Sequence, residues 1–224
     1  MNVSRHEEQP KTPLRQARPV VLSGPSGVGK TTVAERLLRE SPVPLVKSVS
    51  ATTRPPRPGE THGVDYFFLT PEEFFRRREA GEFLETAEVF ENGVWYGTLR
   101  DPVLRLLADG KWVLSVIDVR GAIAVRDALP NAISIFLLPE SRAVLLERLR
   151  GRGTEDEEAV RLRLQRAEEE LRLANHYQYQ VVNDRAENAV ARICRILALE
   201  AGLPGTHKPK EIVADGGSNP CTTN

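Results

Sequence analysis

The chain has 224 residues, of which 31 are basic and 31 acidic, so its formal net charge at pH 7 is zero. That length supports one large domain, or a core with small inserted parts, and a hydrophobic content of 40% is ordinary for a globular protein. Zero net charge argues against a general nucleic-acid or membrane-surface binder, because such proteins carry excess positive charge. The cysteines, Cys194 and Cys221, form no CxxC pair and accompany no His cluster, so we expect free thiols and no cysteine metal site.

The two ends of the chain differ in composition from its middle. Residues 1–18 lack the apolar segment of a secretory signal, and residues 205–224 are rich in Gly, Pro, Ser and Asn. We therefore expect a flexible arm and a disordered tail on either side of one domain at 19–204. No apolar run approaches the length of a membrane span, and we expect a cytoplasmic protein.

Apolar runs and amphipathic segments alternate along the domain. The first run, PVVLS at 19–23, predicts a strand buried on both faces, and TTVAERLLRE after it has apolar residues at helical spacing. Further buried strands are predicted at 111–118, 132–138 and 178–184, and further helices at 101–110, 120–129, 141–150 and 186–200. Strands that alternate with helices predict a parallel sheet with right-handed crossovers, which is an α/β fold.

The stretch GPSGVGKTT lies between the first strand and the first helix. It fits G-x-x-x-x-G-K-[ST], in which glycines leave backbone N–H groups open to phosphate oxygens at a helix N-terminus. Lys30 is the candidate catalytic lysine for the β- and γ-phosphate oxygens, and the Thr31 hydroxyl is the candidate Mg²⁺ ligand. The candidate ATP-binding residues of this loop are Gly24, Pro25, Ser26, Gly27, Val28, Gly29, Lys30, Thr31 and Thr32.

Two segments interrupt the alternation of strands and helices. Residues 50–98 contain Pro-rich loops, aromatic strands and one short helix that Thr70 caps, so we expect an inserted β-rich subdomain. Residues 148–173 read as a Gly-Arg-Gly hinge followed by a charged helix. This helix is either a solvated surface helix with salt bridges or a mobile lid that carries arginines.

A pair of arginines stands on the first interrupting segment. Arg54 and Arg57 lie three residues apart on a loop that prolines stiffen, and Tyr66 follows as a hydroxyl donor. Two arginines on a rigid loop can hold a phosphate group with forked hydrogen bonds. The alternative is an ordinary basic surface loop.

Taken together, these motifs resemble those of the guanylate kinases. The matching stretches cover about residues 19–200 and follow the family order: GPSGVGKTT, SVSATTRPPRPGETHGVDYFF, GEFLETAEV, WYGT, IDVRGA, RLRGRGTEDEE and VVND. The resemblance implies a three-layer P-loop NTPase fold with a parallel sheet, an inserted β-rich GMP-binding subdomain at about 50–98 and a helical lid at about 139–165. It also implies Mg²⁺-dependent transfer of a phosphoryl group from ATP to GMP or dGMP.

The resemblance further implies roles for individual residues. It assigns the GMP phosphate to Arg54, Arg57, Tyr66 and Tyr96, and the guanine base to Ser50, Glu85, Thr98 and Asp118. It assigns catalysis to Lys30 with the lid arginines Arg148, Arg152 and Arg163, and an ATP contact to Asn183. The base assignment is chemically consistent, because one carboxylate accepts both N1–H and N2–H of guanine, whereas adenine has no N1–H. Sites built on such hydrogen bonds discriminate by roughly 10⁴-fold.

Three positions depart from the family pattern. Val116 stands where the family has an acid on the magnesium side of the site, Arg120 replaces a Gln, and two extra residues precede Trp95. Because of Val116, a second hypothesis stays open, in which the chain is an interaction module that binds partners without catalysis. A kinase for another nucleoside monophosphate is a third hypothesis, which Ser50 and Glu85 disfavour. The complete phosphate loop favours the enzyme.

Overall fold

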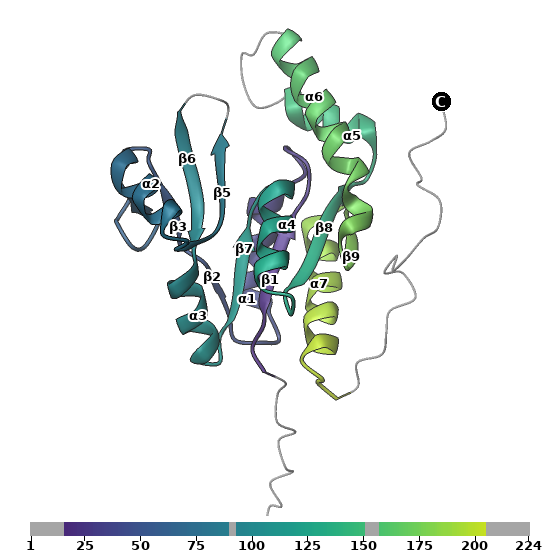
Figure 1. Ribbon diagram of the computed structural model, residues 1–224. Helices are drawn as coiled ribbons and strands as arrows, with labels where there is room; N and C mark the ends of the chain where they lie inside the picture. The colour runs from purple at the N-terminus through teal and green to yellow at the C-terminus, as the bar shows by residue number, and fades with distance from the viewer. Residues whose placement is uncertain (1–15, 90–92, 151–156, 205–224) are drawn as a thin grey trace, which may run out of the picture.

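The computed structural model describes residues 16–89, 93–150 and 157–204, with only the backbone described at 89 and 157–160. A five-stranded parallel sheet forms the centre of the molecule, in the order β2-β7-β1-β8-β9 (Figure 1). Its strands are β1 (Pro19–Ser23), β2 (Leu45–Lys47), β7 (Trp112–Val116), β8 (Ile133–Pro139) and β9 (Tyr179–Asn183). The expected arm and tail, apart from residues 16–18, lie outside the described residues, as do Cys221 and Arg152.

Helices cover both faces of this sheet and make three layers. On one face α1 (Lys30–Glu40) and α7 (Ala186–Glu200) pack on Val20 and Leu22 of β1. On the other face α3 (Arg100–Ala108) and α4 (Val119–Ala128) pack around Val21. Because successive side chains of a strand point to opposite faces, a strand covered on both sides must be apolar throughout, which explains the run PVVLS.

The α/β fold class expected from the sequence is confirmed. Each predicted strand and helix of the core is present, with ends that differ by up to two residues. One strand of the sheet, the edge strand β2, was not predicted from the sequence. β2 has only three residues, LVK, which is too short to show either periodicity.

A second, four-stranded sheet lies beside the first and is inserted between β2 and α3. Its order is β4-β3-β6-β5, with strands β3 (Ser50–Thr52), β4 (Tyr66–Phe68), β5 (Phe83–Val89) and β6 (Val94–Leu99). Helix α2 (Pro71–Glu79) packs on it through Phe74, which belongs to a separate small core with Ala51 and Leu69. The Thr70 hydroxyl accepts a hydrogen bond from the Glu73 N–H at 3.2 Å, so the predicted helix cap is confirmed.

A pair of helices extends from the carboxyl ends of the parallel strands (Figure 1). These are α5 (Arg142–Arg150) and α6 (Glu157–Arg172), which pack together through Leu145, Leu149 and Ala167. A short 3₁₀ helix, η1 (Ala174–His176), then leads into β9. The sheet, the inserted sheet and this helix pair therefore meet at the end of the sheet where the phosphate loop follows β1.

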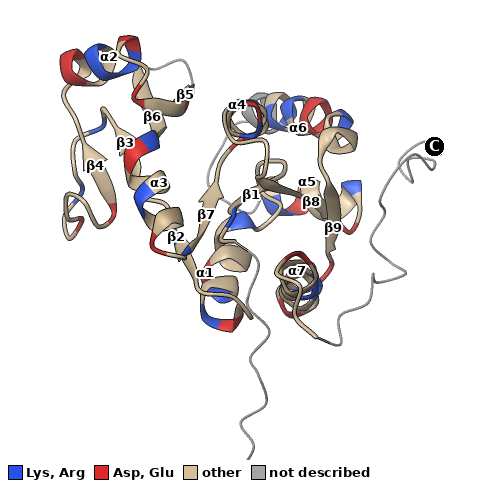
Figure 2. Ribbon diagram, turned by 60° about the horizontal axis from the view of Figure 1, so that its bottom comes forward, with Lys and Arg blue, Asp and Glu red and all other residues tan. Residues whose placement is uncertain are grey.

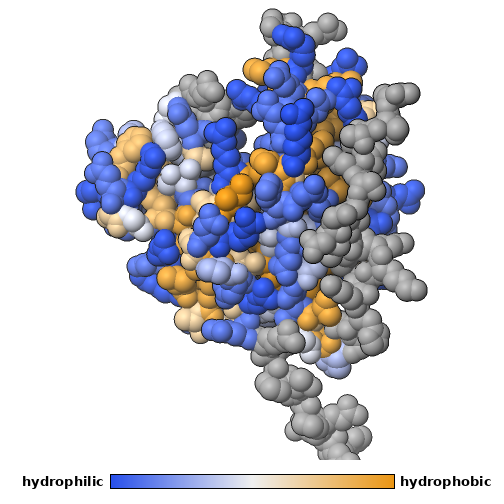
Figure 3. Space-filling view, turned by 45° about the vertical axis from the view of Figure 1, so that its right-hand side comes forward, coloured by the Kyte–Doolittle hydropathy of each residue, from blue (hydrophilic) through white to orange (hydrophobic). Residues whose placement is uncertain are grey.

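Charges of both signs are interspersed over the surface helices, as along α2 and α6 in Figure 2. In Figure 3, hydrophobic residues form a diagonal band across a face that is otherwise mostly hydrophilic. Among the described helices, none is long and apolar enough to cross a membrane.

Candidate functional site

The phosphate loop joins β1 to α1 with its backbone open to an anion. Gly29 caps α1 in the left-handed region at φ 97°, and no side chain makes a hydrogen bond at this cap. The first N–H groups of α1 therefore have no side-chain cap that would compete with a bound phosphate. The Lys30 ammonium folds back over the loop and donates to the carbonyl oxygens of Gly24 and Pro25, at 2.6 and 3.0 Å.

Two side chains from distant elements donate hydrogen bonds to a backbone carbonyl oxygen of the loop. The Asn183 amide, 5% exposed at the end of β9, donates to the Val28 carbonyl at 2.7 Å, and the Arg148 guanidinium on α5 donates to the same oxygen at 3.3 Å. A Cβ on Gly29 would lie 2.7 Å from the Asn183 nitrogen, so this close packing requires glycine. The structure thus places Asn183 and Arg148 against the backbone of the loop.

Four candidate GMP residues form one row across the inserted sheet. Strand register pairs Tyr66 with Ser50, Ser50 with Thr98, and Thr98 with Glu85. Side chains in one row of a sheet point to the same face, so residues from four strands converge there. The pairing of β5 shifts between Phe83 and Glu85, where an irregularity sets the register of Glu85.

Glu85 is the buried carboxylate of this row. It is 8% exposed and accepts a hydrogen bond from the fully buried Thr98 hydroxyl at 2.7 Å. Burial raises the pKa of Glu85 to about 7, the hydrogen bond from Thr98 opposes this rise, and the nearby Asp118 adds to it. A buried carboxyl with a raised pKa, whose hydrogen bonds from the protein come from Thr98, has unused capacity to accept hydrogen bonds from a ligand.

Asp118, which follows the core strand β7, lies near Glu85 of the inserted sheet. It caps α4, where its Oδ1 accepts the Gly121 N–H at 2.7 Å. A Cβ on Gly121 would lie 2.9 Å from Glu85 Oε2 and 3.3 Å from Asp118 Oδ1. Gly121 therefore leaves room for two carboxylates beside the first turn of α4, that of Glu85 on the inserted sheet and that of Asp118 just after β7.

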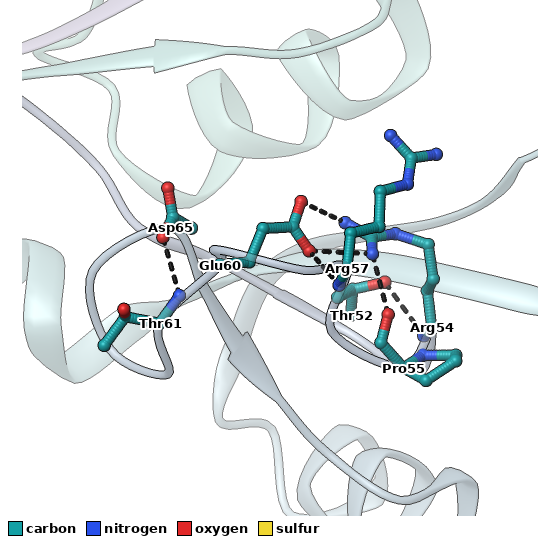
Figure 4. Close-up of polar contacts among 7 residues, drawn as sticks. All are labelled: Thr52, Arg54, Pro55, Arg57, Glu60, Thr61 and Asp65. Atoms are coloured by element: carbon teal, nitrogen blue, oxygen red, sulfur yellow. Dashed lines mark hydrogen bonds and ion pairs between the residues drawn. The ribbon is translucent and has the colours of Figure 1, made fainter.

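The arginine loop carries an ion pair that the sequence analysis did not anticipate (Figure 4). Glu60 accepts from both terminal nitrogens of Arg54, each at 2.9 Å, and also from the Arg57 backbone N–H at 2.7 Å. Glu60 first and Tyr96 second raise the pKa of Arg54, which stays charged. In Figure 4 the Arg57 guanidinium points away from this loop.

Aromatic rings surround the Arg54 guanidinium. It lies 5.4 Å from the centre of the Tyr66 ring and 5.7 Å from that of Phe68, and the rings of Tyr66 and Tyr96 are 5.9 Å apart. Burial raises the pKa of Tyr66, so its hydroxyl keeps its proton at neutral pH. The structure thus brings together Arg54, Tyr66 and Tyr96, three of the four candidate phosphate contacts.

Val116 stands at the position where the family pattern has an acid. Val116 ends β7 and pairs in register with Leu22 of β1, just before the phosphate loop. Its side chain is half-buried and packs against the core. Of the lid arginines, Arg148 contacts the loop and Arg163 is half-buried on α6, while Arg152 lies outside the described residues.

Comparisons with known proteins agree with this geometry. The model of the guanylate kinase family matches residues 16–200. The chain belongs to the guanylate kinase family. It is 52% identical to a guanylate kinase of Rhodopirellula baltica, over 80% of this chain and 87% of that relative, and 48% identical to one of a Nostoc species, over 78% and 86%. The crystal structure of guanylate kinase from Anaplasma phagocytophilum matches with a TM-score of 0.66 and 36% identity, over 85% of this chain and 89% of that one.

Guanylate kinases are enzymes that bind nucleotides and transfer a phosphoryl group, so this chain belongs to a family of transferases. Two residues that shape the site, Glu60 and Gly121, were not among the candidates predicted from the sequence. An acidic residue three positions after Arg57 on the same loop was the signal for Glu60. Nothing local signals Gly121 on α4, because its importance comes from its contact with Glu85 on the inserted sheet.

Proposed function

We propose that this chain transfers the γ-phosphoryl group of ATP to GMP, and to dGMP, with Mg²⁺ bound to the ATP. The observation that carries the proposal is the convergence of two sites at the same end of the molecule. One is an anion-binding loop with an intact lysine, and the other is a row of hydroxyls ending in a buried carboxylate. A phosphoryl transfer enzyme works chiefly by positioning two substrates and stabilising charge on oxygen.

The base site is proposed to recognise guanine through Glu85. Ionised Glu85 accepts N1–H and N2–H together, while Ser50, Thr98 and Asp118 complete the pocket. Adenine has no N1–H at this position, so AMP would leave a buried carboxylate facing a lone pair, which is costly. The phosphate of GMP is proposed to lie against Arg54, Arg57 and the two tyrosines. Because these contacts are to base and phosphate, dGMP uses the same site.

The donor site is proposed to hold ATP on the phosphate loop. Its N–H groups and Lys30, released from Gly24 and Pro25, bind the phosphates. Arg148, Arg152 and Arg163 are proposed to stabilise negative charge on the transferred group. On this account residues 50–98 hold GMP, residues 139–165 form the lid that excludes water, and the reaction takes place in the cytoplasm.

The donor set fits Mg²⁺ held mainly by ATP itself. Thr31 offers an exposed hydroxyl in the first turn of α1, and the described residues hold no group of three His, Cys, Asp or Glu that could bind a metal. Mg²⁺ commonly takes phosphate oxygens, one or two protein oxygens and several waters. The ion, when bound, neutralises charge on the phosphates; Thr31 orients it.

Val116 supports a second candidate, a module that binds GMP or a partner without turnover. The two candidates separate in an assay of ADP formation from Mg-ATP and GMP, run on wild type and Val116→Asp. We expect turnover by the wild type. Turnover only in Val116→Asp would support the impaired module, and GMP binding without turnover in either protein would overturn the kinase proposal.

A further inference from the structure

A carboxylate of the protein itself, that of Glu170, contacts the phosphate loop. Glu170, near the end of α6, accepts a hydrogen bond through Oε2 from the backbone N–H of Ser26, at 3.3 Å. The two residues are 144 positions apart in the sequence. Ser26 belongs to the loop whose N–H groups face phosphate oxygens in the proposed function.

The surroundings of Glu170 match those of a bound phosphate group. Its carboxylate is half-buried and lies close enough to Lys30, Asp118 and Arg166 to interact with their charges. Burial raises the pKa of Glu170, whereas Lys30 and the Ser26 N–H lower it and Asp118 raises it further. A carboxylate accepting a loop N–H beside the phosphate-binding lysine occupies the kind of position that a phosphate oxygen takes.

We propose that Glu170 is a positioning residue of the donor site, which holds the phosphate loop while ATP is absent and is displaced by the phosphates of ATP. This inference rests on the proposed function, since it takes ATP as the ligand of the loop. To bind, ATP must displace Glu170 from the Ser26 N–H. Its phosphates must also approach Lys30, where the negative charge of Glu170 would repel them. The Glu170 contact therefore weakens ATP binding, and its release changes how α6 is held against the loop.

The two glutamates that precede Glu170 have different surroundings in the structure. Glu168 pairs with Arg142 of α5, and Glu169 is exposed on the solvent side of α6. Successive helical residues point in directions about 100° apart, so three glutamates in a row reach three surroundings. Glu169 is therefore a matched control with the same charge and the same helix.

The test measures ATP and GMP binding separately by calorimetry, for wild type, Glu170→Gln and Glu169→Gln. We expect Glu170→Gln to bind ATP about threefold to tenfold more tightly, as for removal of one competing charged hydrogen bond. Inorganic triphosphate should gain the same factor, because the competition is at the phosphates. GMP affinity should stay the same in all three proteins, and Glu169→Gln should match wild type throughout.

Unchanged or weaker ATP binding by Glu170→Gln would overturn the inference, and a melting temperature equal to wild type would show that the variant is folded. A purely structural role predicts weaker binding, so tighter binding separates the two. If wild type binds GMP and fails to bind ATP, the proposed donor is wrong and the inference falls with it. If wild type binds ATP and Glu170→Gln binds it no better, only the inference fails.

Discussion

Glu60 holds Arg54 through two parallel hydrogen bonds of 2.9 Å, although the two residues are only six positions apart. The same carboxylate accepts the backbone N–H of Arg57, so it closes the loop on itself. The loop that carries both arginines is therefore held in one conformation before any phosphate binds. Pre-organisation of this kind reduces the conformational entropy lost when a phosphate binds.

The first prediction concerns this loop. Glu60→Ala should raise the GMP dissociation constant about threefold to tenfold, because Arg54 and the loop backbone lose their common anchor. ATP affinity should not change. Glu79→Ala, at the exposed end of α2, is the matched control and should leave GMP affinity as it is. Tighter GMP binding by Glu60→Ala would show that Glu60 competes with the phosphate and does not prepare its site.

The second prediction uses the contact between α4 and the inserted sheet. Gly121→Ala should weaken GMP binding roughly tenfold, because the new Cβ would lie 2.9 Å from Glu85 Oε2 and must push the carboxylate away. Alanine favours a helix over glycine by about 0.5–1 kcal/mol, but moving Glu85 disturbs its buried hydrogen bond with Thr98, so the melting temperature should hold or fall slightly. Binding of ATP serves as the internal control. Normal GMP affinity in this variant would place guanine away from Glu85.

The third prediction is a pH dependence of GMP affinity. Burial raises the pKa of Glu85 to about 7 in the unliganded protein, and only the ionised form accepts both guanine donors. GMP affinity should therefore fall as the pH drops below 7, by up to about tenfold per pH unit, and level off above it. The phosphate of GMP also titrates near this range, so the comparison is with Glu85→Gln, which shares that titration. Parallel pH profiles for the two proteins would remove Glu85 from base recognition.

The fourth prediction separates binding from chemistry. Lys30→Ala should abolish measurable turnover while GMP affinity stays within about twofold of wild type, because Lys30 belongs to the phosphate loop and the GMP contacts lie on the inserted sheet. The measurement pairs an ADP-release assay with calorimetry of GMP binding. Undiminished turnover would exclude Lys30 from the mechanism.

Much of the core could be predicted from the sequence, because each buried strand is an apolar run and each helix has its own period. The phosphate loop was equally local, since its glycines, Lys30 and Thr31 are consecutive or nearly so. The row from Tyr66 to Glu85 could not be derived from spacing, because it depends on register across four strands and on an irregularity in β5. Apart from Tyr66, those residues were identified by resemblance to a family, and the structure shows why they share a face.

Contacts between distant elements were the part that no pattern predicted. Asn183 was expected to touch ATP, and the structure places its amide on the Val28 carbonyl, where it supports the loop. Glu170 is the last of three consecutive glutamates, and only the packing of α6 shows that this one contacts the phosphate loop. Such contacts depend on how helices dock, which single-sequence periodicity does not encode.

The most direct test of the central claim is the ratio of kcat/KM for GMP to that for AMP, with Mg-ATP as donor, in wild type and Glu85→Gln. We expect wild type to prefer GMP by roughly 10⁴-fold or more, and Glu85→Gln to lose most of that preference through a fall in kcat/KM for GMP. A wild type that phosphorylates AMP as well as GMP, or a Glu85→Gln variant that keeps the full preference, would contradict the account.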